Sequence, residues 1–165
     1  MHSEVAILAG GCFWGVEELF RNLKGVLSTE VGYTGGTIPN PTYDIVKKGT
    51  SGHAESIKIE FDPTLLTYED LLKFFFKIHD PTTKNQQGND VGSQYRSAIF
   101  FQNEEQQKTA LKIKELVEFS GAWKKPVVTE IIKASTFYSA ETYHQAYLKK
   151  NPGGYTCHYI RDIKF

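Results

Sequence analysis

The pattern of apolar residues near the start of the sequence changes from a continuous run to a helical repeat, and this change predicts a boundary between a strand and a helix. Residues 4–9 form a short apolar run of the kind found in a buried strand. From Phe13 onward apolar residues recur every three or four positions, which predicts a helix with one buried face; they are Phe13, Val16, Leu19, Phe20 and Leu23. Gly10 and Gly11 suit a tight turn between strand and helix, and we expect Gly25 to end the helix.

The patterns further along the chain predict alternating strands and helices. Residues 26–33, 54–61, 96–101 and 127–132 have the apolar character or alternation of strands. Helices are expected over 67–78, which opens with a capping box at Thr67, over 103–119, and over 140–148. The resulting order, β-α-β-β-α-β-α-β, predicts an α/β (α+β) fold: a two-layer sandwich of helices against a mixed sheet, with a ferredoxin-like core.

Three stretches have no periodic pattern. Residues 32–53 and 87–95 are rich in glycine and polar residues, and connections this long in a compact domain are usually functional. We expect both to be ordered loops. Residues 150–165 are expected to form a mobile, coil-rich C-terminal tail.

Composition excludes several classes of protein. A chain of 165 residues fits one domain, 1–165, and its 19 basic and 19 acidic residues leave no net charge that would favour nucleic acid or an anionic membrane. No apolar run is long enough to span a membrane, and no signal-peptide pattern is present. Its two cysteines are too far apart to suggest a disulfide scaffold or a metal site. We therefore expect a monomeric, cytoplasmic protein with no metal or other cofactor.

Cys12 and Glu55 are the strongest candidates for chemistry. Cys12 is predicted to lie at a helix N-terminus, where free amides and the helix dipole favour a thiolate, so it is a candidate nucleophile. Glu55 lies two residues before Ile57, on the inward face of a predicted strand. Burial there raises the pKa of a carboxyl group, which makes Glu55 a candidate proton donor.

The loops and the first helix supply further candidates: Tyr43, Asp90 and Tyr95 from the loops, and Phe13 and Trp14 as apolar surface beside Cys12. Each of the polar candidates also has an ordinary interpretation. Glu55 is equally compatible with a surface charge at a strand end, Asp90 with a turn residue, and the tyrosines with loop packing. The residues alone leave these alternatives open.

Several segments together resemble the type A methionine sulfoxide reductases. They are Gly11–Gly15 with Glu17, Gly32–Gly36, Pro39–Tyr43, Gly52–Glu55, His79–Pro81, Gln87–Gly92, Gln94–Ser97, Tyr143–Gln145 with Tyr147–Leu148, and Asn151–Pro152 with Gly154–Tyr155. They occur in the family's order and span nearly the whole chain. The resemblance implies a peptide-methionine (S)-S-oxide reductase, which reduces the S epimer of methionine sulfoxide, free or in proteins, as repair of oxidative damage.

The resemblance also implies a role for each candidate. Cys12 corresponds to the nucleophile and Glu55 to the acid, while Tyr43 and Tyr95 correspond to the tyrosines that bind the sulfoxide oxygen. Asp90 corresponds to the aspartate that orients the substrate. Phe13 and Trp14 correspond to the aromatic residues that hold the substrate methyl group.

The resemblance implies that a second cysteine closes the cycle. Attack on a sulfoxide leaves a sulfenic acid on Cys12, which condenses readily with a thiol. Many family members carry two cysteines in a glycine-rich tail, whereas this tail has only Cys157. The expected product is a single Cys12–Cys157 disulfide, reduced by thioredoxin, or by dithiothreitol in the laboratory.

Three alternatives give Cys12 or its surroundings another function. A thiol peroxidase needs an activating arginine, and the first arginine after Cys12 is Arg21. A cysteine acyl-transferase needs a base, for which His53 or His144 are candidates. A non-catalytic module that binds methionine-containing peptides would retain its function when Cys12 is replaced by serine.

Overall fold

The computed structural model describes residues 3–165, and within that range a six-stranded mixed sheet forms one layer. The strand order is β7-β6-β1-β3-β2-β8, made of β7 (Glu130–Lys133), β6 (Ser97–Phe101), β1 (Glu4–Gly10), β3 (Ala54–Phe61), β2 (Val26–Thr34) and β8 (Tyr138–Ser139). All neighbours pair antiparallel except β6 and β7, which are parallel. Residues 1 and 2, the start of the predicted domain, lie outside the described part.

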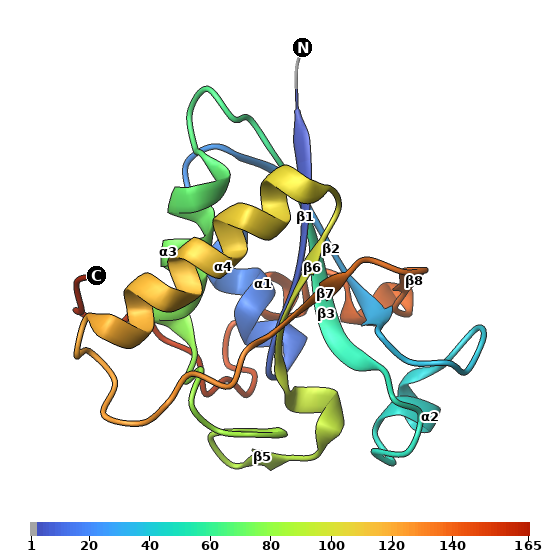
Figure 1. Cartoon of the computed structure of the whole chain (residues 1–165). Helices are drawn as coiled ribbons and strands as arrows, with labels where there is room; N and C mark the ends of the chain where they lie inside the picture. Colours follow the sequence, from blue (N-terminus) through green and yellow to red (C-terminus); the bar gives the residue numbers. More distant parts are fainter. Residues whose placement is uncertain (1–2) are drawn as a thin grey trace.

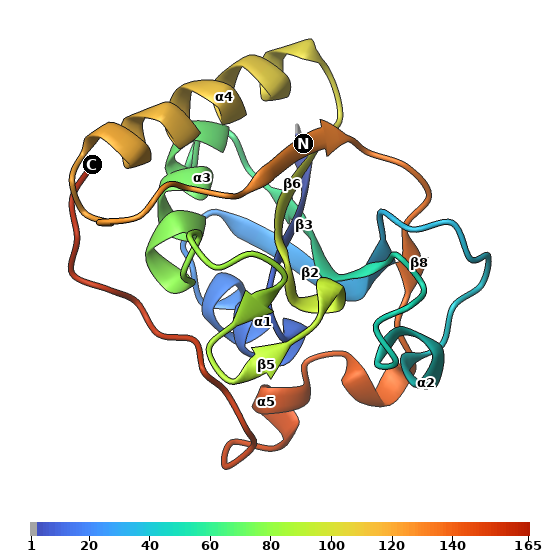
Figure 2. The same ribbon diagram turned by 60° about the horizontal axis from the view of Figure 1, so that its bottom comes forward.

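Three helices form the second layer. Helices α1 (Phe13–Arg21), α3 (Tyr68–Ile78) and α4 (Glu104–Phe119) lie on one side of the sheet (Figures 1 and 2). The central strands β6-β1-β3-β2, with α1 and α3 as their connections, have the ferredoxin-like order. The predicted two-layer sandwich with a mixed sheet is therefore confirmed.

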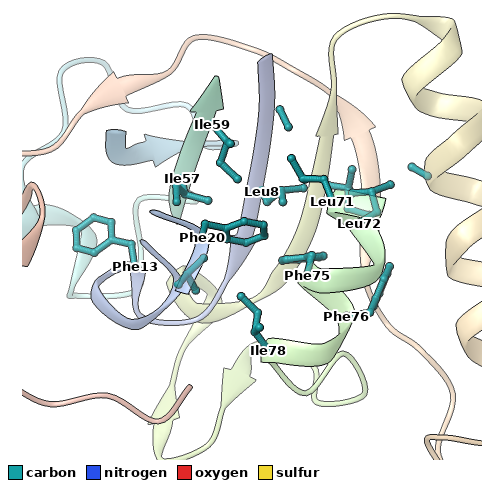
Figure 3. Close-up of a cluster of buried hydrophobic side chains, with 14 of the residues drawn as sticks. Leu8, Phe13, Phe20, Ile57, Ile59, Leu71, Leu72, Phe75, Phe76 and Ile78 are labelled. Carbon is teal, nitrogen blue, oxygen red and sulfur yellow. The ribbon is translucent and has the colours of Figure 1, made fainter. Parts of the chain in front are cut away.

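The main core lies between these layers. Leu8, Ile57 and Ile59 extend from the sheet toward aromatic and aliphatic side chains of α1 and α3 (Figure 3). The core side chains of the helices are Phe13 and Phe20 from α1 and Leu71, Leu72, Phe75, Phe76 and Ile78 from α3. The other face of the sheet carries a smaller cluster, Ile7, Ala9, Ala54, Ala98 and Phe100, which packs against Ala134 and Phe137 of the coil between β7 and β8. The second face is thus covered by coil instead of helices.

The predicted helix 140–148 is wrong. This region contains β8, a 3-10 helix (Thr142–His144) and a short helix α5 (Tyr147–Lys150). Gln145 explains the difference, because its side chain bonds the backbone N–H and C=O of Val31 in β2 (2.9 and 2.8 Å). Ala146 has a left-handed φ of 52°, and its N–H donates to the buried Glu17 carboxylate (2.7 Å). These long-range hydrogen bonds prevent a continuous helix.

Smaller differences concern boundaries and loops. Helix α1 ends at Arg21, before the left-handed Gly25, and β7 begins at Glu130 instead of residue 127. The first loop contains a single helical turn, α2 (Tyr43–Val46), whose N-cap is Thr42. The second contains a hairpin of β4 (Gln86–Gln87) and β5 (Asp90–Val91), followed by a 3-10 helix (Ser93–Tyr95). Across residues 3–165, none of the helices is both long and apolar enough to cross a membrane.

Candidate active site

Cys12 occupies the N-cap of α1, directly after the central strand β1. Gly11 forms the turn with a φ of 102°, and a Cβ at this position would approach the Gln87 side chain to 2.6 Å. Only glycine satisfies both constraints. The turn leaves Cys12 9% exposed, beside the loops at this end of the sheet.

Glu55 is buried near Cys12, as the pattern of β3 predicts. It is 2% exposed, and its Oε1 accepts a hydrogen bond from the Phe13 N–H at the first position of α1 (3.1 Å). Burial raises the pKa of Glu55 to about 8, with a further increase from the Asp90 charge and an opposing effect of the Phe13 amide. The predicted increase in the Glu55 pKa is confirmed, and the carboxyl group holds its proton at neutral pH.

The expected low pKa of Cys12 is wrong for the substrate-free site. Burial raises the pKa of the Cys12 thiol well above its ordinary value, and a negative charge on Glu55 raises it further. The hydrogen bond from the Trp14 amide lowers the pKa but does not offset burial. A helix N-terminus by itself favours a thiolate, whereas in the folded chain Cys12 is covered by segments from distant parts of the sequence.

Tyr43, Tyr95 and Asp90 lie close enough to Cys12 and Glu55 to interact with them electrostatically. Burial, followed by the charges of Glu55 and Cys12, raises the pKa of Tyr43 to about 12, and burial with the Glu55 charge also raises that of Tyr95. Both hydroxyl groups therefore remain hydrogen-bond donors at neutral pH. Burial raises the pKa of Asp90, which accepts a hydrogen bond from the Tyr155 hydroxyl (3.3 Å).

Trp14 is oriented by residues 144 and 147. Its indole N–H donates to Nδ1 of the buried His144 (2.9 Å), and its ring stacks on Tyr147 with centroids 3.9 Å apart. Phe13 and Tyr43 also contact the His144 ring, at centroid distances of 5.2 and 4.6 Å. Phe13, Trp14 and Tyr43 thus surround one histidine.

Glu141 is a site residue that the sequence analysis missed. Its carboxylate accepts hydrogen bonds from the Tyr33 hydroxyl (2.8 Å) and from the Tyr43 N–H at the start of α2 (2.9 Å). This positions the loop that carries Tyr43. Glu141 falls in a segment predicted to be helical, so its role had no local signal.

Neither histidine considered as a base for acyl transfer is free for that role. Both ring nitrogens of His53 bind loop backbone: Nδ1 accepts from the Gly36 N–H (3.1 Å) and Nε2 donates to the Ile38 carbonyl (2.7 Å). His144 Nδ1 accepts from Trp14, so Nε2 of the neutral ring carries the hydrogen and offers no lone pair. Arg21, the first arginine after Cys12, pairs with Glu18 on the same helix (2.6 Å). The contacts favour neither alternative.

Cys157 lies in the coil that follows α5, and both cysteines are free thiols. Its Sγ is 3.9 Å from the Gln87 carbonyl oxygen and 4.0 Å from Asp90 Oδ2. Its charge also contributes to the raised pKa of Cys12. The tail is coil, as predicted, and brings Cys157 to the same loops as Cys12; its mobility stays a prediction.

Comparison with known proteins gives one family. The sequence profile of the peptide methionine sulfoxide reductases matches residues 4–164. The chain is 55% identical to peptide methionine sulfoxide reductase MsrA of Mycobacterium tuberculosis over 159 residues, covering 96% of this chain and 85% of that protein.

Solved structures agree with the sequence match. Reduced Mxr1 from Saccharomyces cerevisiae superposes with a TM-score of 0.90 at 40% identity, covering 97% of this chain and 93% of that one. Mxr1 in complex with Trx2 gives a TM-score of 0.65 at 28% identity, covering 97% and 91%. The fold, the profile and the identity agree, and the chain belongs to the peptide methionine sulfoxide reductase family.

Proposed function

We propose that this chain reduces the S epimer of methionine sulfoxide, free or in proteins, with Cys12 as nucleophile and thioredoxin as the final reductant. The observation that carries the proposal is the pairing of a buried nucleophile with a neutral acid: Glu55 is 2% exposed, and burial raises its pKa to about 8. A sulfoxide sulfur becomes electrophilic only when its oxygen is protonated or strongly hydrogen-bonded. A protonated carboxyl group supplies that proton.

In the proposed first step, Glu55 and the Tyr43 and Tyr95 hydroxyl groups bind the sulfoxide oxygen. Proton transfer from Glu55 to this oxygen leaves a carboxylate, which receives the proton of the Cys12 thiol. The Cys12 sulfur attacks the substrate sulfur. The hydroxyl group then passes from the substrate sulfur to the Cys12 sulfur as the bond between the two sulfurs breaks, so methionine leaves and Cys12 becomes a sulfenic acid. The proposed step starts from the resting state, in which burial keeps the Cys12 thiol and the Glu55 carboxyl group neutral.

Phe13 and Trp14 are proposed to contact the substrate methyl group, and Asp90 to orient the rest of the substrate. The indole is held by a hydrogen bond on one edge and by a stacked ring on one face. A rigid aromatic surface favours a small apolar group over a bulkier one. This arrangement supports selectivity for methyl sulfoxides.

In the proposed second step, Cys157 attacks the sulfenic acid and forms a Cys12–Cys157 disulfide, which thioredoxin reduces. The nearby free Cys157 thiol supports disulfide formation. The solved complex of the similar protein Mxr1 with Trx2 supports reduction by thioredoxin. Thiols and carboxyl groups supply all of the chemistry, so no resident cofactor is required. We also propose a cytoplasmic location, because the cycle depends on a compartment that keeps thioredoxin reduced.

The test is turnover of each methionine sulfoxide epimer, free and in a peptide, with dithiothreitol or with thioredoxin. We expect reduction of the S epimer with both reductants and loss of activity in Cys12→Ser. Hydroperoxide consumption faster than sulfoxide consumption would instead support a thiol peroxidase. A Cys12→Ser variant that retains its function would support a peptide-binding module.

A further inference from the structure

His158 is the only buried residue among residues 151–165, all of which the structure describes. It is 7% exposed, whereas Tyr155, Tyr159 and Ile160 are about half exposed at 45, 58 and 57%. The tail runs from α5 past the end of α3 (Figure 2). A buried polar ring in an otherwise exposed coil requires an explanation.

The ring is held against the turn that carries Cys12. His158 Nε2 donates a hydrogen bond to the carbonyl oxygen of Gly10, two residues before the nucleophile (2.7 Å). Because a carbonyl only accepts, Nε2 carries the hydrogen, and Nδ1 of the neutral ring presents a lone pair. Burial lowers the pKa of His158 to about 4, so the ring is neutral at physiological pH.

Two glycines beside Cys12 make space for this ring. A Cβ on Gly11 would lie 3.0 Å from His158 Nε2, and one on Gly15 would lie 2.4 Å from Nδ1. The Gly15 Cβ would also come within 2.3 Å of Thr156 Oγ1, which accepts the His158 N–H. Gly15 lies within helix α1, where glycine is unfavourable relative to alanine. The packing of the tail against α1 explains why a glycine occupies position 15.

His158 Nδ1 faces the second thiol of the proposed cycle. It is 3.8 Å from Cys157 Sγ, within reach of a weak hydrogen bond from the thiol. The other groups near Sγ are the Gln87 carbonyl, Asp90 and the Tyr155 hydroxyl, which donates to sulfur and lowers the pKa of Cys157. The carbonyl is not a base, and the charge of Asp90 raises the pKa of Cys157, second to burial, and so opposes formation of the thiolate. Nδ1 is the neutral base in contact with the thiol.

We propose that His158 is the general base for disulfide formation and that it positions Cys157 beside the nucleophile turn. This inference rests on the proposed function. Nδ1 accepts the Cys157 proton as Sγ attacks the Cys12 sulfur. The sulfur–sulfur bond forms, the Cys12 sulfur–oxygen bond breaks, and the oxygen leaves as water with a proton from Glu55. The proton on Nδ1 then returns to solvent and Glu55 is reprotonated, so one thiol and one sulfenic acid give one disulfide and one water.

The groups around His158 are compatible with this role. His79, at the end of α3, and Arg161, in the tail, interact electrostatically with the ring. Burial lowers the pKa of His79 to about 3, so it stays neutral, while the Arg161 charge lowers the pKa of His158. Cys157 Sγ lies on the Nδ1 side, and Asp90 contacts that thiol. The low ring pKa keeps Nδ1 unprotonated across the neutral range, although it also makes the ring a weaker base than a solvent-exposed imidazole.

The test compares two variants of the full chain. His158→Gln can retain a donor toward Gly10 but has no base at the Nδ1 position, whereas His158→Ala removes both. Ile160→Ala is a matched control in the exposed part of the tail. Rapid mixing with one equivalent of the sulfoxide S epimer measures methionine formation and loss of free thiols as separate rates. We expect the ratio of disulfide formation to methionine formation to fall about a hundredfold in His158→Gln.

The pH profile separates a base from a merely structural residue. In His158→Gln the disulfide rate should rise about tenfold per pH unit, because only the ionised fraction of Cys157 reacts, while the normal protein gives a flatter profile. Added imidazole should restore part of the rate in His158→Ala. A His158→Gln variant with an unchanged ratio, or with a slow rate that keeps the normal pH profile, would overturn the proposal.

A second oxidant keeps this test independent of the substrate. One equivalent of hydrogen peroxide converts the Cys12 thiol into the same sulfenic acid with release of water. If no methionine forms from either epimer, the proposed function fails, but disulfide formation after peroxide still tests His158. If methionine forms normally and His158→Gln closes the disulfide at the normal rate after both oxidants, only the role of His158 fails.

Discussion

At the scale of single residues, Glu55 and Cys12 are two acids in one buried site, and neither favours its charged form there. Burial is the largest cause of the raised pKa in both cases. A negative charge on either group makes ionisation of the other harder. The pair therefore carries no more than one negative charge readily. Once Glu55 has given its proton to the substrate oxygen, its carboxylate can take the Cys12 proton, and the single negative charge moves to the thiolate.

Replacing Glu55 with glutamine should impair the chemical step while leaving substrate binding intact. The amide occupies a similar volume and still accepts the Phe13 N–H, but it cannot protonate the sulfoxide oxygen. Loss of a general acid typically costs about a hundredfold or more in rate. Steady-state kinetics with the S epimer should show a lower kcat at nearly constant KM. A normal rate across neutral pH would show that Glu55 is not the acid.

Replacing Trp14 with alanine should reduce both affinity and selectivity. The side chain loses its stack on Tyr147 and its hydrogen bond to His144, and the aromatic surface beside Cys12 opens. A contact of this kind is worth a few kcal/mol at most, so kcat/KM should fall by about ten- to a hundredfold. The measurement compares methyl sulfoxides with bulkier ones. Trp14→Phe is the control that keeps an aromatic ring, and equal kinetics in Trp14→Ala for all substrates would place Trp14 outside the methyl-binding surface.

At the scale of elements, the tail separates the two halves of the proposed cycle. Cys157→Ser should release one methionine per enzyme in a burst, because Cys12 is carried by the turn between β1 and α1 and the first step needs no second thiol. Small thiols fit a pocket that accepts the substrate side chain and can reach the remaining sulfenic acid, so dithiothreitol should sustain turnover while thioredoxin should not. A single-turnover burst followed by steady state measures both. Sustained turnover with thioredoxin would exclude the one-disulfide cycle.

Local signals predict some elements well and others poorly. Helix α3 begins at the expected cap, where Thr67 Oγ1 accepts the Asp70 N–H (3.0 Å), and β3 carries Glu55 on its buried side as its alternation indicates. The segment around Gln145 does not form the expected helix, because the Gln145 side chain is hydrogen-bonded to the backbone of β2. The periodicity of apolar residues contains no information on a hydrogen bond between residues more than a hundred positions apart.

The same reasoning explains why some site residues could be predicted from the sequence and others could not. Cys12 and Glu55 stand out because each breaks the pattern of its own element, a cysteine at a helix start and a carboxyl group on an apolar strand. The contacts of Glu141 and His158 depend entirely on packing between distant segments. The pKa of Cys12 was misjudged for that reason too, since burial arises from the assembled fold.

At the scale of the whole molecule, the buried carboxyl group of Glu55 links global stability to pH. Its pKa in the folded protein is about 8, above its ordinary value of 4.5, so folding favours the neutral form. This contribution to stability is complete below pH 4.5 and is lost as pH rises through 8. The loss is at most about 5 kcal/mol at high pH.

Glu55→Gln should therefore be more stable than the normal protein at alkaline pH and closer to it near pH 4. Denaturant unfolding at acid, neutral and alkaline pH measures the difference in the free energy of unfolding. Glu115→Gln, on the exposed side of α4, is the control and should follow the normal pH dependence. Parallel stability curves for Glu55→Gln and the normal protein would contradict a raised Glu55 pKa.

The central position of β1 has a consequence for synthesis of the chain. Cys12 directly follows β1, but the partners of that strand, β3 and β6, end at Phe61 and Phe101. Because β1 cannot complete its pairing before residue 101 is available, the nascent chain carries an uncovered thiol until that residue has been made. A residue that the finished enzyme protects by burial thus becomes enclosed only after the later partners of its strand have been translated. Oxidants present during translation therefore meet Cys12 as an ordinary exposed cysteine.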